Sequence, residues 1–298
     1  INFAGSGLGD ADERNRVLFM SPPAVVNGII GTWAFYNGTQ FASYSSALGI
    51  VPADDSVYTN IAAKGPSVIP NNAAFNARIT EEGSNGPIVL EAETANSVNT
   101  LLQGTNWAAE VAITNGQSLL TSGVIIGEGH AALTIGTNST DGLLMPLVSG
   151  GNLTLANFSD AELTVNTCVT NNTAASSLTK AGNGTVRLTG YNSYSGPTMI
   201  NSGALTFAAG GVTQTLAGVI GGPGALTQES VGGRLNLNAA NTYDGVTTIG
   251  AGTVMVNHNT ALGSSVGYTV ISNGATLDLG STVLGKNVLD LGAEEIFV

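Results

Sequence analysis

The stretch GNGTVRLTGYNSYSGPTMINSGALTF (Gly182 to Phe207) aligns without a gap on VGGRLNLNAANTYDGVTTIGAGTVMV (Val231 to Val256), 49 residues further along the chain. The identical positions are turn glycines, apolar residues and a few polar residues: Gly184/Gly233, Leu188/Leu237, Asn192/Asn241, Tyr194/Tyr243, Gly196/Gly245, Thr198/Thr247, Ile200/Ile249 and Gly203/Gly252. A fixed internal period of this length indicates an array of stacked units and not a single globule.

Each copy has the pattern of short strands separated by turns. In the first copy, Val186 and Leu188 lie on one face of a strand and Arg187 lies on the other, because side chains alternate along a strand. Two more strands are expected around Ile200 and Leu205. One unit cannot bury its apolar face alone, whereas stacked units bury their faces in one continuous column. We therefore predict an all-β chain that forms a parallel β-helix, or β-solenoid, with the shape of a single elongated rod.

Composition supports this fold class and excludes several functions. Only 9% of the 298 residues are charged, against roughly 25% in an average soluble domain, and Gly contributes 41 residues. The net charge of −12 is spread along the chain without a basic cluster, so nucleic acid is not expected as a partner. No apolar run reaches the ~20 residues of a transmembrane helix. Cys168 is the single cysteine, which excludes an internal disulfide.

The Asn-Gly pairs of the sequence leave a second fold open. Six pairs begin at Asn27, Asn37, Asn85, Asn115, Asn183 and Asn273. Such pairs are typical of β-hairpins and would fit an antiparallel sandwich. The corners of a parallel coil also need residues that tolerate positive φ. Because a sandwich gives no reason for the internal repeat, the solenoid is the favoured interpretation.

The repeat is not equally clear along the chain. Residues 1–110 are less regular, and we expect N-terminal coils or a cap with loop excursions there. Residues 111–298 are predicted to form a regular β-solenoid that contains the repeats 182–207 and 231–256.

The segment from Ser177 to Phe207 resembles the autotransporter-associated β-strand repeat. That family's pattern is found here as Leu178-Thr179-Lys180, Gly182, Gly184-Thr185-Val186 and Leu188, followed by Asn192, Tyr194, Gly196, Thr198, Gly203 and Leu205. The second copy departs from it with Gln228-Glu229-Ser230 near the position of the lysine, so its entry turn is expected to differ. The resemblance implies a right-handed parallel β-helix in a large secreted adhesin-like protein, at the outer surface of a bacterium or beyond it. It carries over no catalytic or ligand residues.

Two acidic pairs are the strongest candidates for catalysis. Glu91 with Glu93, and Asp160 with Glu162, are expected to point outward from strands, at spacings that glycoside hydrolysis can use. No Lys or Arg lies within ten residues of either pair, so solvated acidic faces are the preferred interpretation and we assign no catalytic residue. His130 and His258 are interpreted as surface loop residues, and Trp33 and Trp107 either stack on sugars or fill corners.

A calcium site is a weaker hypothesis. Asp10, Asp12 and Glu13 are clustered carboxylates, which hard cations prefer, but Arg14 and Arg16 can pair with them. No other cofactor is expected.

The sequence thus favours an extracellular structural or adhesive protein and not an enzyme. Strand-like residues close to the two chain ends, Ile1, Phe3, Ile296, Phe297 and Val298, are expected to contact another copy or more of the same polypeptide, because open strand edges invite pairing. Surface glycans are a further candidate partner. The alternatives are a carbohydrate-binding or polysaccharide-cleaving β-helix, and the passive stalk of an autotransporter passenger.

Overall fold

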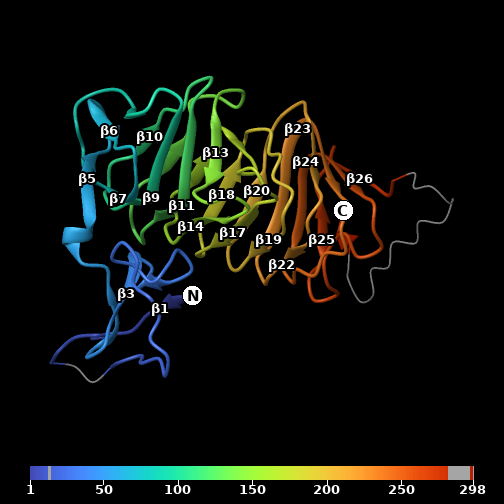
Figure 1. Cartoon of the computed structure of the whole chain (residues 1–298). Coiled ribbons are helices and arrows are strands. Elements are labelled where there is room, and N and C mark those ends of the chain that lie inside the picture. Colours follow the sequence, from blue (N-terminus) through green and yellow to red (C-terminus); the bar gives the residue numbers. More distant parts are fainter. Residues whose placement is uncertain (13–14, 281–295, 298) are drawn as a thin grey trace.

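The computed structural model describes residues 1–12, 15–280 and 296–297, and their regular secondary structure is almost entirely β (Figure 1). Stacked coils run from Tyr58 toward the C-terminus and make a β-solenoid of about nine turns. The first 54 residues form a separate layer beside it. The predicted β-solenoid is therefore confirmed.

Three sheets contain the strands of the described residues. The N-terminal sheet holds β1 (Asn2–Phe3), β2 (Phe35–Tyr36), β3 (Gln40–Ser45) and β4 (Gly49–Pro52). The ten-stranded sheet holds β5 (Tyr58–Ala62), β7 (Asn72–Glu81), β9 (Ala95–Gln103), β11 (Ser118–Ile126), β13 (Leu143–Pro146), β14 (Asn152–Asn157), β16 (Cys168–Val169), β17 (Ser177–Ala181), β19 (Thr198–Ile200) and β22 (Ile220–Gly221). The thirteen-stranded sheet holds β6 (Ser67–Ile69), β8 (Ile88–Leu90), β10 (Ala109–Val111), β12 (Leu133–Ile135), β15 (Leu163–Val165), β18 (Thr185–Leu188), β20 (Ala204–Phe207), β21 (Thr213–Leu216), β23 (Ala225–Leu237), β24 (Thr247–Val256), β25 (Thr269–Ile271), β26 (Thr276–Asp278) and β27 (Ile296–Phe297).

Equivalent residues of successive coils stack directly on one another. Val186 pairs with Leu163 of the preceding coil and with Leu205 of the next, and Leu205 pairs in turn with Leu226. All four side chains are buried in one core cluster that extends from Ile61 to Leu262. The inward positions predicted for the two repeats are therefore core positions.

The Asn-Gly pairs divide between two uses. In the N-terminal layer, Asn37 and Gly38 have positive φ and turn β2 into antiparallel β3, and Asn27-Gly28 joins a single antiparallel bridge. The named strands of the two large sheets pair in parallel, so the other pairs lie in turns of the solenoid. The antiparallel sandwich is wrong for the solenoid, although hairpin chemistry does occur beside it.

The conserved spacing of the two repeats is explained by one corner of the coil. The Asn192 side chain accepts a hydrogen bond from the Val169 amide of the preceding coil, and the Asn241 side chain accepts one from the Ile220 amide. The buried Tyr194 hydroxyl lies 2.9 Å from the Thr198 hydroxyl. A Cβ on Gly196 would lie 2.5 Å from the Ser176 carbonyl oxygen, so only glycine fits there. The motif residues thus join one coil to the next.

Lys180 marks the difference between the copies. It occupies an inward position between Leu155 and Ile200, and its ammonium donates hydrogen bonds to the carbonyls of Ala181, Gly182 and Ser202. Burial lowers the pKa of Lys180 to about 7. The second copy has Glu229 at the aligned position, where β23 shifts register against β24 and Glu229 pairs with Arg187. As expected, its entry turn differs.

The N-terminal layer packs against the flank of the solenoid (Figure 1). Phe35 and Phe41 are buried in a second apolar cluster with outward-facing residues of the ten-stranded sheet, namely Leu102 of β9, Ile125 of β11, Ala156 of β14 and Ala181 of β17. Two hydrogen bonds reinforce the contact. The Asn76 side chain donates to the Asn27 carbonyl, and the Glu128 backbone amide donates to the Gly38 carbonyl. The layer therefore covers one face of several consecutive coils.

Parallel pairing between coils of the solenoid begins at β5, well before residue 110. The expected division of the chain into residues 1–110 and 111–298 stays a prediction about domains. Helical structure among the described residues is a single 3-10 turn, Asp55–Val57, and no helix there is long and apolar enough to cross a membrane.

Candidate binding groove

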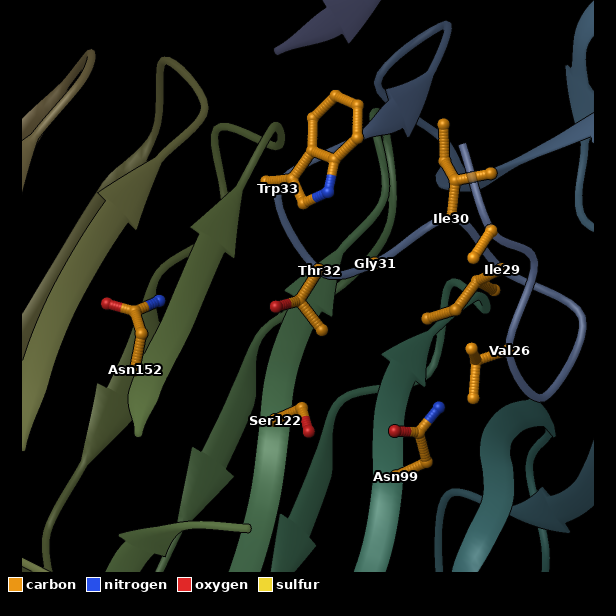
Figure 2. Close-up of a pocket in the computed structure, with 10 residues that line it drawn as sticks. Val26, Ile29, Ile30, Gly31, Thr32, Trp33, Asn99, Ser122 and Asn152 are labelled. Carbon is orange, nitrogen blue, oxygen red and sulfur yellow. The ribbon is translucent and has the colours of Figure 1, made fainter. Parts of the chain in front are cut away.

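A groove of about 320 Å³ lies where the N-terminal layer meets the flank of the solenoid (Figure 2). One wall is the loop that precedes β2, with Gly31, Thr32 and Trp33. The floor is formed by Asn99, Ser122 and Asn152, which come from β9, from β11 and from the start of β14. The remaining lining residues are apolar: Ala24, Val26, Ile29 and Ile30. The groove is thus built from segments far apart in the sequence.

Trp33 is exposed and yet held in place. Its side chain is 43% exposed, and its ring packs edge-on against Phe3 with centroids 6.4 Å apart. Gly31 has a φ of 122°, and a Cβ there would lie 2.8 Å from the indole ring. The glycine therefore allows the indole to lie close to the neighbouring backbone while much of the side chain remains exposed.

The polar lining carries no charge. Asn99 donates a hydrogen bond to the Asn76 side chain at 2.9 Å, and Asn152 donates one to the Thr154 hydroxyl at 3.0 Å. The Thr32 hydroxyl lies 3.2 Å from the Thr154 hydroxyl, which ties the wall to the floor. Among the residues that the structure describes, no Asp, Glu, Lys or Arg lines the groove. It therefore offers amides, hydroxyls and one aromatic face to a ligand.

The acidic pairs lie at bends and not on outward strand faces. Glu91 follows the end of β8, and its carboxylate accepts a hydrogen bond from the Asn71 amide, while Glu93 is exposed nearby. Asp160 and Glu162 precede β15, and Glu162 accepts a hydrogen bond from the Thr164 hydroxyl. Both strands are present but shorter than predicted, since β8 ends at Leu90 and β15 begins at Leu163, so the acidic residues fall in the adjacent bends.

The histidines and the N-terminal carboxylates are not brought together. His130 lies in the corner after β11, where burial lowers its pKa, and His258 follows β24 and accepts a hydrogen bond from the Thr260 amide. Asp10 accepts a hydrogen bond from the Asp12 amide, and Glu13 lies outside the described residues. Within the ranges that the structure describes, no three His, Cys, Asp or Glu side chains gather as a metal site would require.

The proposed end-contact residues lie in different parts of the molecule. Ile1 and Phe3 belong to the N-terminal layer, where β1 pairs with β2 and Phe3 packs against Phe19. Ile296 and Phe297 form β27, which pairs in parallel with β25 of the solenoid, and Val298 lies outside the described residues. Contact between copies through these residues stays a prediction.

Sequence reasoning missed the groove because its parts share no motif. The sequence indicates Trp33 as a residue that could stack on sugars, but its partners on β9, β11 and β14 are Asn and Ser in a chain rich in both. A usable signal is nevertheless present. The strands Ala95–Gln103 and Ser118–Ile126 have apolar residues next to one another, as in Leu101-Leu102 and Ile125-Ile126, which indicates burial on both faces.

Comparison with known proteins gives a consistent assignment. The sequence profile of the passenger-associated-transport-repeat matches residues 178–207 and 232–256, which are the two copies of the repeat. The adhesin BmaC autotransporter of Brucella suis biovar 1 (strain 1330) is 31% identical over 259 residues, which is 80% of this chain and 7% of that protein. No solved structure matches the chain. The repeats, their place in a β-solenoid and this similarity agree, and the chain belongs to the autotransporter passenger proteins that carry the passenger-associated-transport-repeat.

Proposed function

We propose that the chain is an adhesive and structural element that acts outside the cell, at or beyond the outer surface of a bacterium. The observation that carries the proposal is the use of the polar residues in the repeat. The Asn and Tyr residues of both repeats are buried: Asn192, Tyr194, Asn241 and Tyr243. Both asparagine side chains accept hydrogen bonds from a neighbouring coil, and the Tyr194 hydroxyl bonds to Thr198 within its own coil. The repeats therefore build length, and the outer surface is left for contact with other molecules.

The low charge of the chain supports the same proposal. Its exposed polar residues are mainly the uncharged Ser, Thr and Asn, and acidic residues outnumber basic ones by 20 to 8 in the sequence. Clustered basic residues, which nucleic acid binding needs, are absent from the sequence. The curated relative is named an adhesin, and the chain spans only 7% of its length. Adhesion and the lack of enzymatic activity are accordingly proposals for this chain.

The test is attachment. Beads coated with the purified chain are added to cultured mammalian epithelial cells and to immobilised extracellular matrix, and beads coated with a heat-unfolded sample serve as the control. We expect the folded chain to raise attachment several-fold over that control. No gain on either surface would contradict adhesion and favour a passive stalk. Release of reducing ends from a panel of polysaccharides, lost in Glu91→Gln or Glu93→Gln, would instead favour a cleaving β-helix.

Association through the chain ends is a separate part of the proposal. β27 lies at the edge of the thirteen-stranded sheet, next to β25, and open strand edges pair readily. Sedimentation velocity over a range of concentrations tests it. We expect dimers or longer species in the wild type and fewer of them in Phe297→Lys. A monomer at every concentration would contradict the end contact without affecting the adhesion assay.

A further inference from the structure

We infer that the groove between the N-terminal layer and the solenoid binds a neutral oligosaccharide, with Trp33 as the stacking residue. The inference deepens the proposed adhesive function, on which its biological meaning rests, by naming the ligand class and the site. Binding itself is a property of the isolated chain and is measured without cells.

The first argument is the chemistry of the lining. Sugars have apolar C–H faces and many hydroxyl groups, and an exposed indole offers an apolar face with a polar N–H at its edge. Amide groups can donate and accept hydrogen bonds, and hydroxyls can do both as well. Trp33, Asn99, Ser122 and Asn152 place these groups around one space (Figure 2). A purely apolar ligand would leave the Trp33 indole N–H and the Ser122 hydroxyl without hydrogen-bond partners.

The second argument is the absence of charge around the groove. A site for phosphate, sulfate or a sialic acid needs Arg or Lys, and a cation site needs carboxylates. Neither kind of residue is found in the groove lining within the described part of the chain. Uncharged hydroxyl groups are therefore the ligand groups that this lining satisfies.

The third argument is that suitable groups are free. No hydrogen bond within the described residues involves the Trp33 indole nitrogen or the Ser122 hydroxyl, although both line the groove. Their neighbours are already fixed, since Thr32 contacts Thr154 and Asn99 contacts Asn76. The site is thus largely preformed, which lowers the entropic cost of binding a flexible glycan.

The fourth argument is size and shape. A space of about 320 Å³ falls at the lower end of the range for small-ligand sites, near 300 Å³. The groove is open to solvent and not enclosed. One or two sugar rings can occupy it while the rest of a chain extends along the flank, so an oligosaccharide fits better than an enclosed cofactor.

The experiment uses the purified 298-residue chain on an array of neutral, sialylated and sulfated oligosaccharides. The strongest neutral glycan is then titrated by isothermal titration calorimetry. We expect Trp33→Ala to weaken binding at least about tenfold and Ser122→Ala about threefold. Trp107→Ala is the matched control, because Trp107 is 47% exposed and contacts Lys64 at another place on the molecule. It should change binding less than about twofold.

Several outcomes would overturn the inference. These are silence of the wild type on all neutral glycans, binding confined to sialylated or sulfated ones, and equal losses in Trp33→Ala and Trp107→Ala. Trp33→Phe retains a ring and should bind between wild type and Trp33→Ala, which keeps the test valid where the alanine variant unfolds. A displayed peptide library is panned in parallel, and peptides that depend on Trp33 while glycans fail would assign the groove to a protein ligand.

The inference and the proposed function fail separately. Silence on the array with attachment of coated beads would refute the glycan groove and leave adhesion standing. Glycan binding that depends on Trp33, without attachment of coated beads, would refute adhesion and leave the glycan groove standing.

Discussion

The coils near the N-terminal layer and the repeat coils from Ser177 onward stabilise the same β-solenoid in different ways. In the C-terminal halves of β9 and β11, both faces of the strand are buried, because the N-terminal layer covers Leu102 and Ile125 on the outside. In β18 and β19, burial alternates around outward residues such as Arg187, and the corners carry the Asn and Tyr motif. The first region depends on a lateral partner, whereas the second depends on contacts between coils.

This difference has a functional meaning. A solenoid made only of repeat coils can be extended without limit and presents the same flank at each turn. The N-terminal layer covers the flank of some coils only, so the flank is no longer the same at each turn. The groove with Trp33 forms at the border of this layer. We therefore expect ligand binding beside the N-terminal layer, where the regular flank is interrupted. The regular repeat coils are expected to extend the solenoid.

The largest expected effect is separation of the N-terminal layer from the solenoid. Ile125→Arg places a charge without a partner in the apolar contact with Phe35, and burying such a charge costs several kcal/mol. Undocking of the N-terminal layer relieves that cost. We expect the undocked population to rise about a hundredfold, equivalent to about 3 kcal/mol. Limited proteolysis with thermolysin should then cleave within residues 1–54.

The matched control introduces an arginine on the outer face of the thirteen-stranded sheet, away from the contact with Phe35. Thr134 faces outward on β12 between Glu110 and Thr164, so Thr134→Arg should leave proteolysis and stability within about 0.5 kcal/mol of wild type. Equal protease sensitivity in the two variants would mean that the layer does not protect the flank, and the comparison between the two regions would fail.

The second effect tests the repeat corner. Gly196 has an ordinary φ, but an added methyl would lie 2.5 Å from the Ser176 carbonyl oxygen of the coil below. Gly196→Ala should therefore lower the free energy of unfolding by about 2 kcal/mol, as overpacking does. Chemical denaturation measures it. Gly5→Ala serves as the control, because nothing lies within 4 Å of its Cβ position, and an equal loss there would contradict the steric explanation.

The periodic part of the fold could be predicted from the sequence and the lateral part could not. The alternation of Val186, Arg187 and Leu188 and the repeated Asn and Tyr encode local strands and their stacking, so their roles follow from spacing alone. The contact of Phe35 with Ile125 and Phe158 joins distant residues without a repeat, and no spacing rule identifies it. The groove is also built from distant residues without a repeat. Among its lining residues, the sequence therefore points only to Trp33 as a ligand-binding candidate.

Lys180 tests how the repeat tolerates a buried cation. The folded chain holds the pKa of Lys180 at about 7, against 10.5 for an exposed lysine, so between these values the unfolded chain binds more protons. The free energy of unfolding should therefore rise as pH increases from about 7, by up to about 1 kcal/mol per pH unit.

Lys180→Met removes this titration. The difference between wild type and variant, followed by chemical denaturation from pH 6 to 9, isolates the lysine from other titrating groups. We expect a smaller dependence on pH in the variant, whatever its absolute stability, because methionine has no group that gains or loses a proton in this range. Parallel curves for the two proteins would show that the lysine stays protonated in the folded chain throughout this range.

The smallest effect concerns a single hydroxyl pair in the repeat. Tyr194→Phe leaves the buried Thr198 hydroxyl without the partner that lies 2.9 Å away in the wild type, and should lower the free energy of unfolding by about 1 kcal/mol. The double variant Tyr194→Phe with Thr198→Val removes both polar groups and should recover most of that loss. Chemical denaturation of the four proteins in this cycle gives the coupling between the hydroxyls. Additive losses would mean that the tyrosine acts in the repeat only by filling the core, and that the hydroxyl pair plays no part in holding the uncovered coils together.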